Sequence, residues 1–376
     1  MTQADKRKLR VGVIFGGQSG EHEVSLASAK GIMDAMDRDK YEVIPIGITK
    51  TGQWLSGDTI HQKLLEAAAD HPVIAELAKD NAGSSTQTTT ALTLGLNSNE
   101  PLDVVFPVLH GTLGEDGAIQ GFFEMVGVPY VGAGVTASAT GMDKAICKDI
   151  FRANGLPIVI HRTFLRRRWK KEPDAVIAEC EAAMPYPMFV KPANLGSSVG
   201  IHKAKDRATL QAAFDDAARY DRKLIVEQGI NAREIEVSVL GNDDPIASVP
   251  GEIVPSREFY SYAAKYLDDS SDLLIPAPLS EEYTEMIQNL AILSYQALDC
   301  SGLARCDFLL DNDNGTLFVN EVNTMPGFTP ISKYPKLWEA SGLSYSELID
   351  RLIDLAIERF TDKQENETNF DVGTAE

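Results

Sequence analysis

Apolar residues follow two different spacings along the first third of the chain. Short apolar runs cover residues 9–15, 41–48 and 103–109, and the last (DVVFPVL) is typical of a strand covered on both faces of a sheet. Between the first two runs, residues 23–36 have helical spacing. Strands that alternate with helices predict a doubly wound α/β domain with a parallel sheet, ending near Val131.

The remaining chain mixes shorter strands with helices. A helix is predicted over residues 143–154, because Gly155-Leu156-Pro157 stops it. The last helix begins with a capping box formed by Ser344 and Glu347. The polar, acidic residues from Thr361 onwards predict a disordered tail. Four further strands are predicted, at residues 187–191, 199–203, 224–228 and 234–240.

Two breaks in the pattern divide the chain. Residues 132–141 are small and Gly-rich, and Asn231-Ala232 separates two strands. A chain of 376 residues is also too long for one ordinary core. The sequence therefore predicts an N-terminal α/β domain, two further units and a tail, over residues 1–131, 132–231, 232–362 and 363–376.

Composition narrows the class of protein. Apolar residues make up 44% of the chain and charged residues 24%, as in globular proteins. The net charge of −20 argues against a nucleic-acid partner, because phosphate backbones require a basic face. Four cysteines without metal spacing indicate free thiols in a reducing cytosol. We find no signal peptide and no run of roughly 18 to 20 apolar residues, so we expect a cytoplasmic protein without membrane contact.

A hairpin near the C-terminus carries the most informative polar residues. The apolar runs 303–310 and 316–322 are joined by the turn sequence DNDNG. Side chains two positions apart on a strand share a face. If the strands pair, carboxylates and an amide therefore converge on a half-buried surface beside an arginine. These residues are Arg305, Asp307, Glu321 and Asn323.

Crowded carboxylates raise one another's pKa unless a cation lies between them. Oxygen ligands suit Mg²⁺, which takes its remaining ligands from water and substrate phosphates. The alternative is a surface hairpin with a solvated Arg305–Asp307 pair, and the residues alone leave both interpretations open.

A second candidate is the segment FVKPANLGSSVG at residues 189–200. Its glycines allow backbone N–H groups to approach a ligand closely, and its serines add hydroxyl donors, so the loop can cradle phosphates beside Lys191. An ordinary hairpin turn is the alternative. GAGVTA at residues 132–137 fits a relaxed dinucleotide fingerprint, but no acidic residue ends a second strand about 20 residues later.

Polar motifs also follow the N-terminal strands, where α/β sheets bind ligands. His110 begins HGTLGEDG after the third strand, and a buried structural histidine is the alternative interpretation. After the first strand, Glu21 or Glu23 could cap the helix or meet a substrate ammonium. The irregular, aromatic and charged residues 256–272 indicate a lid, or else a surface loop.

Together these motifs closely resemble the D-alanine–D-alanine ligases of the ATP-grasp superfamily. The resemblance runs from Val11 to about Phe360 and rests on GGQSGEHEVSL, HGTLGEDGAIQG, VGAGVTASATGMDK, FVKPANLGSSVG, the E-x-Y-x-Y-x-x-K-Y pattern, RCDFLL and NEVNTMPGFTPIS, in this order. It implies an α/β and α+β multidomain chain, in which an ATP-grasp fold follows the N-terminal doubly wound domain. Residues 132–231 would be the central ATP-grasp subdomain, and residues 232–362 the C-terminal one with the metal site and the lid.

The resemblance also implies roles for individual residues. ATP would contact Lys144, Lys191, Gly196, Ser197, Ser198, Glu227, Glu234, Phe259 and Lys265. Asp307, Glu321 and Asn323 would hold two Mg²⁺ ions, for which Mn²⁺ could substitute. D-Alanine would contact Glu21, His110, Lys265, Arg305 and Ser332, and the catalytic set would be Glu21, Ser197, Tyr266, Arg305 and Gly327.

The implied reaction is ATP-dependent formation of D-alanyl-D-alanine through an acyl phosphate, for peptidoglycan precursor synthesis, by a cytoplasmic homodimer. The alternatives are a D-alanine–D-lactate ligase, another ATP-grasp carboxylate–amine ligase, and a non-catalytic or NAD-type nucleotide-binding protein. Tyr266 and the His110 motif favour the dipeptide enzyme. No role is assigned to the basic residues 165–171 or to Lys333.

Overall fold

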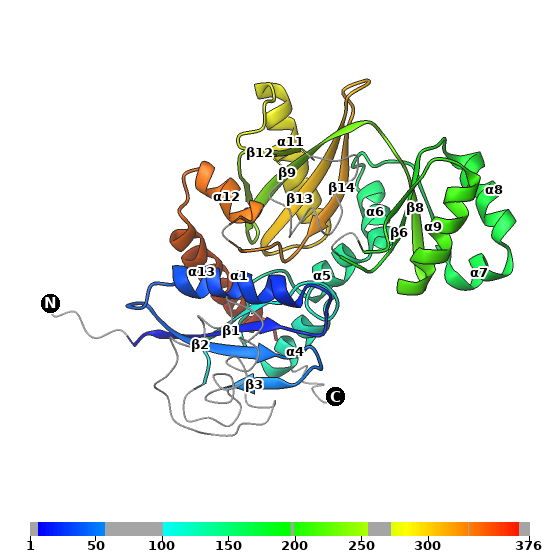
Figure 1. Cartoon of the computed structure of the whole chain (residues 1–376). Helices are drawn as coiled ribbons and strands as arrows, with labels where there is room; N and C mark the ends of the chain where they lie inside the picture. The colour runs from blue at the N-terminus through cyan, green and yellow to red at the C-terminus, as the bar shows by residue number, and fades with distance from the viewer. Residues whose placement is uncertain (1–6, 57–100, 197–198, 255–271, 330, 368–376) are drawn as a thin grey trace, which may run out of the picture.

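The computed structural model describes residues 7–56, 101–196, 199–254, 272–329 and 331–367 (Figure 1). These residues form three sheets, with helices packed on them. No helix among them is both long and apolar enough to cross a bilayer.

The N-terminal sheet has the strand order β3-β2-β1-β4. Strand β1 pairs in parallel with β2 and with β4, and β3 adds an antiparallel edge, so the predicted α/β domain is confirmed. The strands are β1 (Leu9–Gly16), β2 (Tyr41–Ile48), β3 (Trp54–Ser56) and β4 (Val104–Val108), and the helices α1 (His22–Ala35) and α4 (Ala118–Val126) accompany them.

A smaller antiparallel sheet has the order β5-β8-β6-β7, and three helices cover one of its faces (Figure 1). The basic segment that had no assigned role forms α7 and buries Trp169, whose ring stacks on Phe214 with centroids 4.5 Å apart. The strand predicted at residues 199–203 begins later, at His202. The elements are β5 (His161–Leu165), α7 (Arg166–Lys171), α8 (Pro173–Ala183), β6 (Met188–Pro192), β7 (His202–Ala204), α9 (Arg207–Tyr220) and β8 (Lys223–Gln228).

The large sheet is antiparallel, with the order β12-β11-β9-β13-β14, and β10 pairs with β9. The predicted hairpin is confirmed as β13 and β14. Its strands are β9 (Ala232–Gly241), β10 (Ile246–Ala247), β11 (Gly251–Val254), β12 (Asp272–Leu274), β13 (Gly302–Asp311) and β14 (Leu317–Asn323). Helices α5 (Val135–Met142), α6 (Lys144–Ala153) and α11 (Glu281–Ala297) share its hydrophobic core.

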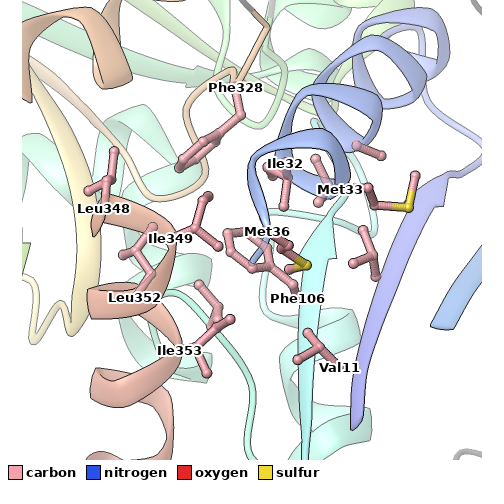
Figure 2. Packing of buried hydrophobic residues seen from close by; sticks show 14 of the residues in the cluster. Val11, Ile32, Met33, Met36, Phe106, Phe328, Leu348, Ile349, Leu352 and Ile353 are labelled. Carbon is pink, nitrogen blue, oxygen red and sulfur yellow. The ribbon is translucent and has the colours of Figure 1, made fainter. Parts of the chain in front are cut away.

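The end of the chain returns to the N-terminal domain. After α12 (Lys333–Ala340), helix α13 (Tyr345–Gln364) packs against α1 and the N-terminal sheet (Figure 2). The labelled core residues Phe106, Phe328 and Leu352 meet there, and burying each such side chain contributes about 1.5–3 kcal/mol. The predicted capping box is confirmed at the start of α13.

Helix α13 continues to Gln364. The predicted start of the disordered tail, at Thr361 or at residue 363 as a separate unit, is therefore wrong. Two cations attach the last turns of the helix to the N-terminal domain. The Arg359 guanidinium lies 4.3 Å from the centre of the Tyr130 ring, and Lys363 Nζ is 2.5 Å from Glu124 Oε2. The amino-acid composition of residues 361–376 does not predict these contacts, because their partners are far away in the sequence.

Candidate active site

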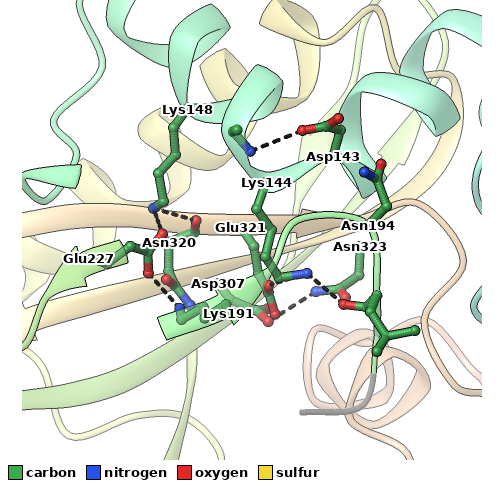
Figure 3. A network of polar contacts seen from close by, with 12 residues as sticks. Asp143, Lys144, Lys148, Lys191, Asn194, Glu227, Asp307, Asn320, Glu321 and Asn323 are labelled. Atoms are coloured by element: carbon green, nitrogen blue, oxygen red, sulfur yellow. Dashed lines mark hydrogen bonds and ion pairs between the residues drawn. The ribbon is translucent and has the colours of Figure 1, made fainter. Parts of the chain in front are cut away.

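Three carboxylates lie in a row across the large sheet. Asp307 on β13 is paired in register with Glu236 on β9 and with Glu321 on β14. Arg305 Nε and Nη2 donate to the two carboxylate oxygens of Asp307, each at 2.7 Å. Asn323 Nδ2 donates to Asp307 Oδ2 at 3.0 Å (Figure 3). The predicted convergence of the hairpin side chains is therefore confirmed.

Negative charge is concentrated around the central carboxylate. Burial raises the pKa of Asp307 to about 6; Arg305 opposes this shift, and Glu236 and Glu321 add to it. Among the described residues, no group of three or more His, Cys, Asp and Glu side chains is arranged to hold a metal ion. The available donors are two carboxylates and the Asn323 amide, a set that fits Mg²⁺ because this ion keeps waters and substrate phosphates as ligands.

Sequence analysis missed Glu236 and its partner Lys333. Glu236 is buried, and its carboxylate lies 3.3 Å from Arg305 Nε and 3.1 Å from Lys333 Nζ. The available signal was the spacing of Glu234 and Glu236, since positions two apart on β9 share one face of the sheet.

A second cluster surrounds Glu227 at the end of β8. Lys191 Nζ lies 2.5 Å from one carboxylate oxygen of Glu227, and Lys148 Nζ lies 3.1 Å from the other (Figure 3). Lys148 also donates to the Asn320 carbonyl at 3.1 Å. Burial alone would raise the pKa of Glu227, but the two ammonium groups lower it to about 2. Burial lowers the pKa of Lys191, and the nearby carboxylates raise it above its ordinary value.

Lys144 connects the Gly/Ser loop to the acidic hairpin. It begins helix α6, whose first N–H groups are capped by Asp143. Its Nζ donates to the Leu195 carbonyl at 2.8 Å and lies 3.8 Å from Glu321 Oε2. A cation thus lies between the candidate phosphate loop and a candidate metal ligand.

Glu21 occupies the N-cap position of α1, but its side chain makes no capping hydrogen bond. Two glycines from distant segments instead lie against its carboxylate. A Cβ atom added to Gly111 would be 2.6 Å from Glu21 Oε2, and one added to Gly196 would be 2.9 Å from it. Gly111 also has a positive φ of 73°, which favours glycine. The Gly/Ser loop and the loop after β4 therefore converge on Glu21.

Glu115 is a further residue that sequence analysis left without a role, although it lies within the HGTLGEDG motif. The Gly111 N–H donates to Glu115 Oε2 at 2.5 Å. Burial, together with the neighbouring Glu21 carboxylate, raises the pKa of Glu115 to about 8. Glu115 therefore keeps its proton to a higher pH than an ordinary glutamate does.

His110 joins the N-terminal domain to the loop after β14. Its Nδ1 lies 3.0 Å from the Met325 carbonyl oxygen, and its Nε2 lies 3.3 Å from Ser28 Oγ. Ser28 Oγ in turn accepts from the Phe328 N–H at 3.1 Å. Burial lowers the pKa of His110 and so favours the neutral ring, although Glu21 opposes this shift. The two ring nitrogens serve structural contacts here, beside Glu21.

The loop after β14 brings Gly327 and Ser332 together. A Cβ atom on Gly327 would lie 2.8 Å from Ser332 Oγ. This hydroxyl accepts from the Thr329 N–H at 2.9 Å rather than capping α12. Predicted site residues that lie outside the described part of the chain are Ser197, Ser198, Phe259, Lys265 and Tyr266, with nearly all of the predicted lid.

Comparisons with known proteins identify the family of the chain. Residues 10–133 match the family model described as D-ala D-ala ligase N-terminus, and residues 150–354 match the one described as D-ala D-ala ligase C-terminus. The chain is similar to the D-alanine–D-alanine ligase of Heliobacterium modesticaldum, with 53% identity over 361 residues, 96% of this chain and 98% of the relative. It is 50% identical to that of Ruminiclostridium cellulolyticum, over 96% of this chain and 99% of the relative.

Solved structures give the same result. The D-alanine–D-alanine ligase from Coxiella burnetii superposes with a TM-score of 0.79 at 38% identity, covering 96% of this chain and 97% of that one. The VanG D-Ala:D-Ser ligase from Enterococcus faecalis superposes with a TM-score of 0.78 at 36% identity, covering 93% of this chain and 100% of that one.

Proposed function

The chain belongs to the D-alanine–D-alanine ligase family, whose solved structures have the ATP-grasp fold, and on this premise we propose that it joins two D-alanine molecules at the expense of ATP. The product, D-alanyl-D-alanine, serves peptidoglycan precursor synthesis. The observation that carries the proposal is that the acidic hairpin, the lysines around Glu227 and the loops that converge on Glu21 meet at one site.

The chemistry requires an activated carboxylate, because an amine does not attack a carboxylate at neutral pH. Transfer of the terminal phosphoryl group of ATP to the first D-alanine forms an acyl phosphate and releases ADP. The amine of the second D-alanine then attacks the acyl carbon, and phosphate leaves. Fixed cations lower the barrier by stabilising the charge that develops on the transferring phosphoryl group.

We assign ATP to the region between the lysine cluster and the acidic hairpin. Lys144 and Lys191 would contact the phosphates, and Gly196, Ser197 and Ser198 would fold over them. Glu227 and Glu234 would meet the adenine and the ribose, beside Phe259 and Lys265. Asp307, Glu321 and Asn323 would hold two Mg²⁺ ions, which supply positive charge to the phosphates when bound.

We assign the first D-alanine to the place where the Gly/Ser loop and the loop after β4 converge on Glu21. The Glu21 carboxylate would accept from the substrate ammonium, and His110 would lie close by. Arg305 and the Gly327 N–H would stabilise the oxyanion of the tetrahedral intermediate, and Ser332 with Lys265 would hold the carboxylate of the second D-alanine. Ser197 and Tyr266 would connect the lid to Glu21 and exclude water from the acyl phosphate.

A different second substrate is the alternative within this family. A D-serine or D-lactate acceptor would use the same acyl phosphate, and the VanG neighbour is named a D-Ala:D-Ser ligase. Tyr266 favours the amine acceptor, because a neutral phenol does not repel an ammonium group. We also propose that the protein works in the cytoplasm, where its four buried thiols would stay reduced, and that it forms a homodimer.

The test is a product assay with ATP, Mg²⁺ and D-alanine, alone and in competition with D-serine, D-lactate or L-alanine. We expect phosphate and D-alanyl-D-alanine in equal amounts, with D-alanine preferred as acceptor. Phosphate release without dipeptide, or equal use of L-alanine, would contradict the proposal. Sedimentation of the purified protein tests the homodimer separately.

A further inference from the structure

Glu236 differs from the other two carboxylates of the row in its neighbours. Asp307 contacts the hairpin residues Arg305 and Asn323. Glu321 lies near the ammonium group of Lys144. Glu236 is more deeply buried, with 5% of its side chain accessible compared with 25% for Glu321.

Two cations converge on this buried carboxylate from different parts of the fold. Arg305 approaches one carboxylate oxygen from β13, at 3.3 Å from Nε. Lys333 approaches the other from the first turn of α12, at 3.1 Å from Nζ. A buried carboxylate is retained at low cost only when it is paired, and here one carboxylate pairs with both cations.

Through Lys333, the pairing with Glu236 also acts on the start of α12. Lys333 directly follows Ser332, and the Ser332 hydroxyl lies against Gly327. Holding the Lys333 ammonium therefore fixes the start of α12 and the Gly327–Ser332 loop relative to the large sheet. The Glu236 carboxylate also limits the rotation of the Arg305 side chain. If Arg305 were bonded to Asp307 alone, it would move whenever Asp307 moved.

We propose that Glu236 is a positioning residue for the second half of the reaction. It sets the distance between the Arg305 guanidinium and the Ser332–Lys333 start of α12, and so shapes the place where the second D-alanine binds and attacks. This inference rests on the proposed function for the identity of the acceptor. The joint anchoring of Arg305 and α12 rests on the described contacts alone.

The matched substitution is Glu236→Gln, which keeps the shape of the side chain. Glutamine offers one acceptor oxygen, so it can satisfy Lys333 or Arg305 but not both, and its NH₂ group faces the other cation. Glu236→Asp keeps both acceptor oxygens on a shorter stem and should partly restore function.

A control of the same kind exists on the neighbouring strand. Glu252 on β11 is buried and accepts two hydrogen bonds from Arg233, at 2.8 and 2.6 Å. Its register partner is Ile235, a residue of the core shared with α11, so Glu252 lies on the sheet face opposite to Glu236. Glu252→Gln removes a comparable buried charge without touching Arg305 or α12.

The kinetic experiment measures KM separately for the first D-alanine, the second D-alanine and ATP. For Glu236→Gln we expect KM for the second D-alanine to rise about tenfold or more, as for loss of a hydrogen bond to a charged group, with KM for ATP within about twofold. Phosphate release should exceed dipeptide formation, because water captures the acyl phosphate when the amine is misplaced. Lys333→Met alone should raise the same KM, and the double variant Glu236→Gln/Lys333→Met should rise by less than the product of the two single effects, because the two side chains share one contact.

A structural readout keeps this inference separate from the proposed function. Amide hydrogen exchange over residues 331–340 should become faster in Glu236→Gln than in wild type, and should stay unchanged in Glu252→Gln, whether or not dipeptide forms. Unchanged exchange in Glu236→Gln, or a uniform fall in kcat with no change in KM for the second D-alanine, would overturn the positioning role. Failure of the wild-type protein to make dipeptide would instead overturn the proposed function.

Discussion

Glu227 is a buried glutamate and Glu115 a half-buried one, at two sides of one site, and their pKa values move in opposite directions. The pKa of Glu227 is lowered to about 2, and that of Glu115 is raised to about 8. Burial raises both, so burial cannot explain the difference. The neighbours do: Glu227 lies between the ammonium groups of Lys148 and Lys191, whereas Glu115 lies beside the carboxylate of Glu21.

The comparison indicates two uses of the same side chain. On the lysine side, an ionised glutamate holds cations in place where phosphates would bind. On the Glu21 side, the raised pKa of Glu115 keeps its proton in place to a higher pH, which reduces the negative charge beside Glu21. Asp307 lies between these cases, with one cation and two acids around it and a pKa raised to about 6.

The largest effect is expected at this intermediate residue. Asp307→Ala should reduce turnover by on the order of a thousandfold, since removing a fixed group that stabilises transition-state charge costs about a hundredfold to a thousandfold and a metal ligand is lost as well. The fold should persist, because Glu236 still pairs with Arg305. Steady-state ADP release and thermal melting check both points. Near-native turnover at saturating Mg²⁺ would show that the hairpin acids are structural.

The next effect concerns stability on the lysine side. Glu227→Ala leaves Lys148 and Lys191 without their shared carboxylate, and breaking a buried ion pair from one side costs about 3–5 kcal/mol. Glu227→Gln should cost less, since it keeps one acceptor. Urea unfolding at pH 7 measures both. Equal stability of Glu227→Ala and wild type would mean that water or nearby backbone already solvates the two ammonium groups.

The smallest effect is expected at Glu115, where the raised pKa makes the stability of the protein depend on pH. An unfolded glutamate has a pKa near 4.5, and folded Glu115 has one of about 8. The stabilisation from its proton is complete below pH 4.5 and is lost as pH rises towards 8, because the unfolded chain releases the proton first. Glu115→Gln removes this loss. Solvent screening reduces the full effect of this shift, because Glu115 is only half-buried, so the free energy of unfolding of Glu115→Gln should gain about 1–3 kcal/mol relative to wild type between pH 5 and pH 8.

Denaturant titrations of both proteins at several pH values measure this difference, with Glu124→Gln as a control whose pKa shift is in the opposite direction. Parallel pH profiles for Glu115→Gln and wild type would mean that Glu115 is ionised in the folded protein at neutral pH.

The sequence predicted the hairpin well, because its alternation and its turn residues are local signals. Residues whose importance depends on distant neighbours were missed. Glu115 is identified only once the fold places Glu21 beside it. Glu236 is identified only once the fold places Arg305 and Lys333 around it. The helical end of α13 was missed for the same reason, since Arg359 and Lys363 are anchored on the N-terminal domain.

The central claim is that ATP activates the carboxylate of the first D-alanine as an acyl phosphate. The most direct measurement uses D-alanine labelled with ¹⁸O in both carboxylate oxygens and follows the label into the released phosphate by mass spectrometry. In the proposed reaction, one carboxylate oxygen bridges to phosphorus and leaves with it. We therefore predict one ¹⁸O atom in each phosphate and an equal amount of D-alanyl-D-alanine. Unlabelled phosphate would mean that water attacks ATP directly, and would contradict the account.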